Sequence, residues 1–485
     1  MEVPVSERLS SLDVSFLYLE QPTTAMHTGS VMIFRLPPRR GIDIDRLTRY
    51  VGAKIVTTPR YRQRVRSVPG RLANPVWVDD EDFDLSYHVR QQTLPKPGDD
   101  EQLAALVARL QAGPLDRHRP LWELHLVEGL AGGRFALVTK VHQALVDGVR
   151  AVDIGQLILE DDPKPSAPPE IDWQASPGPS TSELIAGAIG ESIRRPGQLA
   201  DVLRGGLVDV RDTAAIVARS AGRVLGAARR MAGTPPRSPL LRTVSSQRRF
   251  AMITTSLDDY RTIRNGSMLT PASKGRRPPS SLHTTVNDVV LAVLAGALRA
   301  WLMTRGEPVP ADSSVRTLVP MSVLPADLED SAPLGSRLAS LLVDLPTGEA
   351  SPMIRLHQVA YQTKAYRDTG RAIDANRLAG IAGFAPPTLH SLGARLASSL
   401  SNRMFHLVVT NVPGPQQVLY ADGARLLSTF PVVPLAAGQA LSIGVTSYAG
   451  SLYYGLNADR EAMPDVDLVG HCITDALAEL LEAVR

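Results

Sequence analysis

A histidine at the predicted end of a strand is the most pointed chemical feature of this sequence. His142 stands in the run VHQALVDG, where Gln143 follows it and Asp147 and Gly148 come shortly after. A histidine at a strand end, followed by a turn, an acid and a glycine, is typical of a general-base site. A lone histidine in a strand is also typical of a hydrogen-bonded core residue, and both interpretations stay open at this point.

The elements around this run would place it at a turn between a strand and a helix. Residues 135–141 (FALVTKV) predict a strand, and residues 149–159 predict a helix. Further along, residues 249–255 predict a strand, and residues 285–302 predict a long buried helix. The last third of the chain alternates helical runs with strand-like runs at residues 317–319, 338–343, 406–410, 441–446 and 451–456. The sequence therefore predicts an α/β fold of mixed element order.

Composition excludes several classes of protein. The 485 residues are 44% apolar and 21% charged, which excludes a disordered or collagen-like chain, and the single Cys472 cannot form an internal disulfide. The longest apolar run, residues 289–298, ends at Arg299 and is too short to span a membrane. Because the first residues also lack an apolar signal segment, we expect a cytoplasmic protein. A net charge of +3 gives no indication of nucleic acid as a partner.

A Pro- and Ser-rich stretch divides the chain. Residues 161–180 read as a linker, so we expect an N-terminal lobe at 1–161, a linker with basic amphipathic helices at 162–245, and a C-terminal lobe at 246–485. Residues 182–249 hold twelve Arg against five acids. The helical part, residues 182–232, fits either a helix packed on the body of the protein or an interfacial helix on anionic lipid.

Seven motifs, the first of them in two parts, stand in order along the chain. They are LDVSFLYLE at 12–20 with MHTG at 26–29, PLWE at 120–123, HQALVDG at 142–148, VNDV at 286–289, VPMS at 319–322, TNVPGP at 410–415 and GLNAD at 455–459. Together they resemble the wax ester synthase/diacylglycerol acyltransferase family, a branch of the chloramphenicol acetyltransferase-like superfamily, whose HHxxxDG signature corresponds to residues 142–148.

This resemblance implies a fold, a reaction and two kinds of substrate. The fold would have two lobes of mixed sheets flanked by helices, with an active-site tunnel between them. The reaction would move a fatty acyl group from acyl-CoA to diacylglycerol or a long-chain alcohol, at a membrane or lipid-droplet surface. Acyl-CoA would be a co-substrate, and we expect no bound cofactor and no metal, since no spaced Cys/His/Asp cluster is present.

The resemblance also implies roles for individual residues. In the family the second His of the signature is the general base, Asp147 would brace the loop that orients it, and Gly148 would permit the turn. Here Gln143 replaces the second His, and glutamine has no titratable nitrogen. Three functions therefore stay open. The first is an acyltransferase in which His142 or another group is the base, and the second is a catalytically impaired relative that binds acyl-CoA or lipid. The third is an acyltransferase with a non-lipid acceptor, since the superfamily also acylates amines and secondary alcohols.

Three further residues are candidates for substrate binding. Asn287 and Asp288 could line the acyl-transfer channel, although residues of these types also cap helices. Glu20 could face the site, although a single acid near the N-terminus is also typical of a solvated position. His471 and Asp475 are spaced four apart on a predicted terminal helix, and we interpret them as structural.

Overall fold

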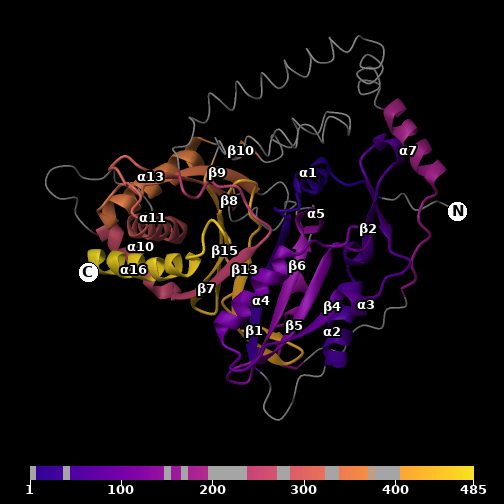
Figure 1. Cartoon of the computed structure of the whole chain (residues 1–485), viewed down its shortest axis with the longest axis horizontal. Helices are drawn as coiled ribbons and strands as arrows, with labels where there is room; N and C mark the ends of the chain where they lie inside the picture. Colours follow the sequence, from indigo (N-terminus) through magenta and orange to yellow (C-terminus); the bar gives the residue numbers. More distant parts are fainter. Residues whose placement is uncertain are drawn as a thin grey trace, which may run out of the picture.

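A computed structural model describes residues 7–35, 44–146, 154–164, 173–194, 238–269, 284–322, 338–369, 373–374 and 405–485. The chain folds into two lobes, each built on a mixed β-sheet with helices packed against it (Figure 1). The predicted α/β class, with mixed sheets flanked by helices, is confirmed.

The first lobe contains a six-stranded sheet in the order β12-β13-β1-β6-β5-β4. Its strands are β1 (His27–Arg35), β4 (Val89–Thr93), β5 (Trp122–Leu130), β6 (Arg134–His142), β12 (Tyr420–Ala421) and β13 (Ala424–Val432). The central strands are apolar and buried; Phe34 of β1 stacks on Phe135 of β6 with ring centroids 5.1 Å apart. The predicted strand at 135–141 is confirmed as part of β6.

Short helices and a small second sheet surround this six-stranded sheet. The helices are α1 (Ser11–Leu19), α2 (Ile44–Val56), α3 (Leu85–His88), α4 (Asp100–Ala112), α5 (Gln143–Val146) and α6 (Ile154–Ile158), with 3-10 turns η1 (Pro59–Arg62) and η2 (Pro69–Arg71). Strands β2 (Gln63–Arg66) and β3 (Val76–Asp79) form a hairpin-like antiparallel pair. The predicted helix at 149–159 is present as α6 over its second half, and residues 147–153 lie outside the described residues.

The second lobe contains a seven-stranded sheet in the order β10-β9-β8-β11-β14-β15-β7. Its strands are β7 (Arg248–Ser256), β8 (Val315–Ser322), β9 (Leu338–Leu345), β10 (Ile373–Asp374), β11 (Leu407–Val412), β14 (Leu441–Tyr448) and β15 (Ser451–Asp459). The helices α10 (Leu257–Leu269), α11 (Val286–Thr304), α13 (Pro352–Thr369) and α16 (Val466–Val484) gather beside this sheet (Figure 1). All strands predicted in this part of the chain are confirmed, as is the long helix.

Helix α11 is the core of the second lobe. It is the one helix among the described residues that is long and apolar enough to cross a membrane, but 72% of its most apolar window is buried inside the protein. All residues from Val289 to Leu298 are buried, and the helix packs against α16 and α13. Burial on all sides by protein explains the apolar composition of this helix.

Two strands from the C-terminal part of the chain belong to the sheet of the first lobe. Residues 420–432 contain β12 and β13, and β13 pairs antiparallel with β1. In this pair Val432 of β13 is the partner of Gly29 of β1. The expected C-terminal lobe, 246–485, is therefore not one contiguous unit. The physical reason is the apolar face of β13, whose Leu426 and Phe430 are buried in the first core.

The junction between the sheets depends on two glycines. Gly444 of β14 and Gly455 of β15 are direct cross-strand partners, and Pro431 of β13 lies against both. A Cβ on Gly455 would lie 1.9 Å from the Pro431 carbonyl oxygen, and one on Gly444 would lie 2.7 Å from the Pro431 Cβ. Only glycine permits this close approach of β13 to the second sheet.

The expected linker region is described in part. Residues 173–180 have no regular structure, and α7 (Thr181–Arg194) follows them. Leu184 of α7 packs against Val76 and Val78 of β3, so this helix rests on the first lobe. The rest of the predicted amphipathic segment, residues 195–237, lies outside the described residues.

Candidate functional site

Two histidines face each other where β1 begins and β6 ends. His27 and His142 are cross-strand partners in the antiparallel pair, so their side chains lie on the same face of the sheet. Their ring centroids are 5.9 Å apart, and the rings meet edge to face. Both side chains are buried. The predicted strand end thus carries a pair of imidazoles.

The orientation of the His142 ring follows from the helix that comes next. His142 directly precedes α5, and its Nδ1 accepts a hydrogen bond of 3.1 Å from the backbone N–H of Ala144. In the neutral ring the proton must therefore be on Nε2, which lies 3.8 Å from Glu20 Oε2. Burial lowers the pKa of His142 to about 3, so the ring is neutral near pH 7.

Glu20 joins both histidines to a cation. It follows the last residue of α1, its Oε1 lies 3.1 Å from His27 Nε2, and its Oε2 accepts hydrogen bonds from the Arg117 guanidinium. Burial opposes ionisation of this carboxyl, but the contacts with His27 and Arg117 outweigh burial and lower its pKa to about 2. Glu20 is therefore a carboxylate facing the predicted site, with a side chain that is 12% exposed.

His27 belongs to the MHTG motif, and its sequence context did not indicate a site residue. Burial lowers its pKa, against the opposing effect of Glu20. Both ring nitrogens are buried, and neither makes a hydrogen bond among the described residues, although Nε2 lies 3.1 Å from Glu20 Oε1. A buried, unpartnered nitrogen is costly, which is typical of a position that a ligand or water fills during function.

Gln143 is tied to the same strand end through its backbone. Its N–H donates to the carbonyl of Met26 over 2.9 Å, which brings the residue next to His27. Its side-chain Oε1 is buried and has no partner within the described part of the chain. The remaining signature residues, Asp147 and Gly148, lie outside the described residues.

A second buried polar group lies on the same sheet face. Lys140, two residues before His142, is the cross-strand partner of Glu123, with Nζ 4.0 Å from Oε2. Glu123 also contacts His125 at 3.2 Å and Arg90 at 3.1 Å. Burial lowers the pKa of Lys140, whose ammonium donates to the carbonyl of Gly113. A lysine, an acid and histidines inside an apolar sheet make this face strongly polar.

Asn287 and Asp288, the two candidates at the start of α11, have different hydrogen-bond partners. Asp288 is in the cap of α11: its Oδ2 accepts from the Thr285 N–H at 2.8 Å, and its Oδ1 accepts from the Thr363 hydroxyl at 2.6 Å. Both oxygens are used inside the protein. Asn287 accepts a 2.9 Å hydrogen bond from Asn411 Nδ2, which joins two of the sequence motifs.

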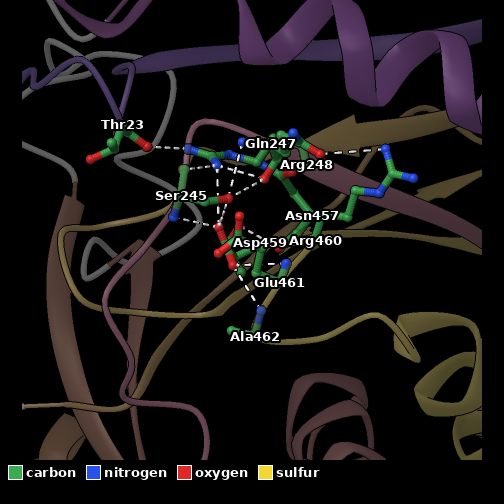
Figure 2. Close-up of polar contacts among 10 residues, drawn as sticks. Thr23, Ser245, Gln247, Arg248, Asn457, Asp459, Arg460, Glu461 and Ala462 are labelled. Atoms are coloured by element: carbon green, nitrogen blue, oxygen red, sulfur yellow. Dashed lines mark hydrogen bonds and ion pairs between the residues drawn. The ribbon is translucent and has the colours of Figure 1, made fainter.

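An arginine from the second lobe holds the segment between Glu20 and His27. Figure 2 shows Arg248 of β7 reaching the carbonyl oxygen of Thr23, while its other nitrogen donates to the carbonyl of Ser245 over 2.7 Å. Asp459 lies 3.7 Å from the same guanidinium and is fully buried. Asp459 in turn accepts from the Ser245 backbone and hydroxyl, each at 2.7 Å.

No group of three or more metal-binding side chains is found among the residues that the structure describes. Four residues of the site escaped the sequence reasoning as functional candidates: His27, Arg117, Lys140 and Arg248. The available signal was charge inside apolar strands: Lys140 and His142 interrupt the run 135–142 at a period of two, which places them on one face. Arg117 and Arg248 meet the site only through tertiary structure.

Comparison with known proteins gives consistent matches over the chain. A model of the wax ester synthase/diacylglycerol acyltransferase catalytic domain matches residues 9–267, and a model of the C-terminal domain of that family matches residues 334–481. The probable diacylglycerol O-acyltransferase tgs3 of Mycobacterium tuberculosis is 46% identical over 258 residues, covering 53% of this chain and 95% of the relative. The putative diacylglycerol O-acyltransferase Rv3480c of the same organism is 33% identical over 99% of this chain and 98% of its own length.

Solved structures agree with these matches. The wax ester synthase/diacylglycerol acyltransferase from Marinobacter aquaeolei VT8 has a TM-score of 0.67 and 26% identity, covering 98% of this chain and 99% of that one. The first condensation domain of the calcium-dependent antibiotic synthetase has a TM-score of 0.54 at 14% identity, covering 100% of this chain and 98% of that one. At that identity the second match shows a common fold.

Proposed function

The chain belongs to the wax ester synthase/diacylglycerol acyltransferase family, and from this premise we propose that it transfers a fatty acyl group from acyl-CoA to the hydroxyl of diacylglycerol or a long-chain alcohol. The products would be triacylglycerol or wax ester. The observation that carries this proposal is the buried cluster of Glu20, His27 and His142 at the end of β6, which coincides with the family's signature.

The chemistry needs a base because an alcohol is a poor nucleophile. An imidazole that removes the hydroxyl proton during attack on the thioester carbonyl can return it to the leaving thiolate, which contributes about 10²–10⁴ in rate. Burial keeps His27 and His142 neutral, the protonation state in which an imidazole can accept a proton. The ionised Glu20 between them can stabilise the imidazolium that forms.

A second candidate function, binding of acyl-CoA or lipid without turnover, is favoured by one observation. Gln143 occupies the position of the family's base, and the Nδ1 lone pair of the neighbouring His142 already accepts from Ala144. In that case the fold would bind its ligands and serve a partner or regulatory role. Restoration of the histidine distinguishes the two functions.

The test compares wild type with Gln143→His, using labelled palmitoyl-CoA as donor and diolein or hexadecanol as acceptor. His471→Gln is the matched control, because it removes an exposed histidine on α16, remote in sequence from the signature. We expect wild type to form labelled triacylglycerol or wax ester at a rate equal to that of the control. Turnover by Gln143→His alone would favour the binding function, and no product from either would contradict the acyltransferase proposal.

We also propose that the protein is cytoplasmic and docks on a membrane or lipid-droplet surface through the segment that begins with α7. Two large apolar side chains support this. Ile189 of α7 is 51% exposed. Leu72, which directly follows η2, is 54% exposed, and η2 is in contact with α7. Flotation with anionic liposomes, comparing the full chain with a chain lacking residues 182–232, tests the idea. Equal flotation of both chains would contradict it.

A further inference from the structure

We propose that His27 is the general base of this enzyme and takes over the role of the imidazole that Gln143 does not supply. This inference rests on the proposed acyltransferase function and adds to it a catalytic residue from a different strand. It follows from the place of His27, from the bonding of its two ring nitrogens, and from the bonding of its neighbour His142.

The place is suitable because β1 brings His27 to the signature. His27 is the cross-strand partner of His142, and the preceding carbonyl, that of Met26, accepts the Gln143 N–H over 2.9 Å. The His27 ring therefore lies on the sheet face of His142 and within one residue of the backbone contact of Gln143. The structure thus supplies an imidazole from β1 next to the backbone of the residue that replaces the family's base.

The two ring nitrogens of His27 have the environment that a base requires. Nε2 lies 3.1 Å from Glu20 Oε1, an ion-pair contact without hydrogen-bond geometry, and the nearby negative charge favours the tautomer with its proton on Nε2. The lone pair is then on Nδ1, which has no partner among the described residues. A carboxylate beside one nitrogen, with the other nitrogen free to accept a proton, is the arrangement that orients an imidazole as a base.

His142 lacks this freedom. Its Nδ1 accepts from the Ala144 N–H, so its neutral ring presents an N–H group on Nε2, the nitrogen nearer to Glu20. It can help to orient Glu20 but has no unbound lone pair. Of the two imidazoles, only His27 combines a carboxylate neighbour within 3.1 Å with an unpartnered nitrogen.

The surroundings of His27 favour the neutral form of its ring in the free enzyme. The groups that act on it are the carboxylates of Glu20 and Glu123, the ammonium of Lys140 and the burial of the ring itself. Burial dominates and lowers the pKa of His27. The ring is therefore unprotonated near pH 7, and Glu20 is positioned to stabilise the cation that forms during the reaction.

The step balances with the substrates already proposed. The acceptor oxygen forms a bond to the thioester carbonyl carbon while its proton moves to His27 Nδ1. The tetrahedral intermediate then collapses, the carbon–sulfur bond breaks, and the imidazolium gives the same proton to the leaving thiolate. No oxidant, reductant or metal takes part.

The experiment measures acyl transfer from palmitoyl-CoA by wild type, His27→Gln, Gln143→His and the double variant His27→Gln/Gln143→His, with His471→Gln as control. We expect His27→Gln to lower kcat by about 10²–10⁴. We expect the kcat of the double variant to be at least about tenfold higher than that of His27→Gln, because Gln143→His restores the family's base. Thermal unfolding of each variant verifies that it folds.

Rescue separates a catalytic from a structural role. Loss of activity in folded His27→Gln with no recovery in the double variant would overturn the proposal, as would wild-type activity in His27→Gln. An inactive wild type beside an active Gln143→His would also overturn it, while leaving the acyltransferase site intact. Inactivity of both would contradict the proposed function itself, and the base assignment with it.

Discussion

Arg248 donates a hydrogen bond to the carbonyl oxygen of Thr23, so a side chain of the second lobe fixes the chain between Glu20 and His27 in the first. The guanidinium is itself held by the Ser245 carbonyl and by the buried Asp459, which belongs to the GLNAD motif. The motif's acid thus acts at a distance, through Arg248, on the position of the site.

Replacement of this arginine should misplace Glu20 and His27 without unfolding the protein. Arg248→Lys keeps the charge beside Asp459 but cannot bond both carbonyls, since an ammonium lacks the planar fork of a guanidinium. We expect kcat to fall roughly 10–100-fold, because small misplacements of reacting groups have effects of this size. Steady-state kinetics with Arg242→Lys, an exposed arginine, as control would test this; equal kcat in the two variants would contradict it.

Stability should depend on pH through buried histidines. Burial lowers the pKa of His88 to about 4 and that of His142 to about 3, below the ordinary value of 6.5. A histidine whose folded pKa is depressed stabilises the fold above pH 6.5 and loses this contribution as pH falls, because the unfolded chain then binds more protons. We expect the free energy of unfolding to drop between pH 7 and 5.5, by up to about 1.4 kcal/mol per pH unit for each histidine.

Urea unfolding at pH 7, 6 and 5.5 measures this slope. His88→Gln should flatten it, since the variant has one buried titratable ring fewer. An unfolding free energy that stays constant across the range would rule out neutral, buried histidines.

Asp288 should affect stability rather than substrate binding. Asp288→Ala removes one of the two hydrogen bonds of the capping box of α11 and the partner of the Thr363 hydroxyl, so we expect a loss of about 1–3 kcal/mol in unfolding free energy. The KM for acyl-CoA and acceptor should stay at the wild-type value. A raised KM in a variant of unchanged stability would instead support the channel-lining role considered from the sequence.

The glycine junction between the sheets should tolerate no side chain. Gly455→Ala would place a Cβ 1.9 Å from the Pro431 carbonyl oxygen, and we expect destabilisation on the order of 3 kcal/mol. Gly190→Ala in α7 is the control, because nothing lies within 4 Å of its added Cβ. Calorimetric melting temperatures compare the two, and similar values would show that β13 can move away from β15.

Elements with a local signal were predictable, and relationships between distant elements were not. The strand at 135–141 and the helix at 285–302 are apolar runs with clear ends, so periodicity located both. The entry of β13 into the first sheet has no local signature, since its alternation fits either sheet. The signature around His142 indicated the site, whereas the pairing of His27 with Glu20 depends on a strand register and a helix end that only the fold brings together.

The pairing of β13 with β1 affects the protein during its synthesis. Thr28 of β1 meets Val432 of β13 across 404 positions of sequence, so that edge of β1 has no partner until nearly the whole chain has left the ribosome. At about 5–20 residues per second, the exposed edge would persist for roughly 20–80 s in each new molecule. An open strand edge of that duration is a template for wrong pairing, which makes nascent chains of this protein natural clients for chaperones.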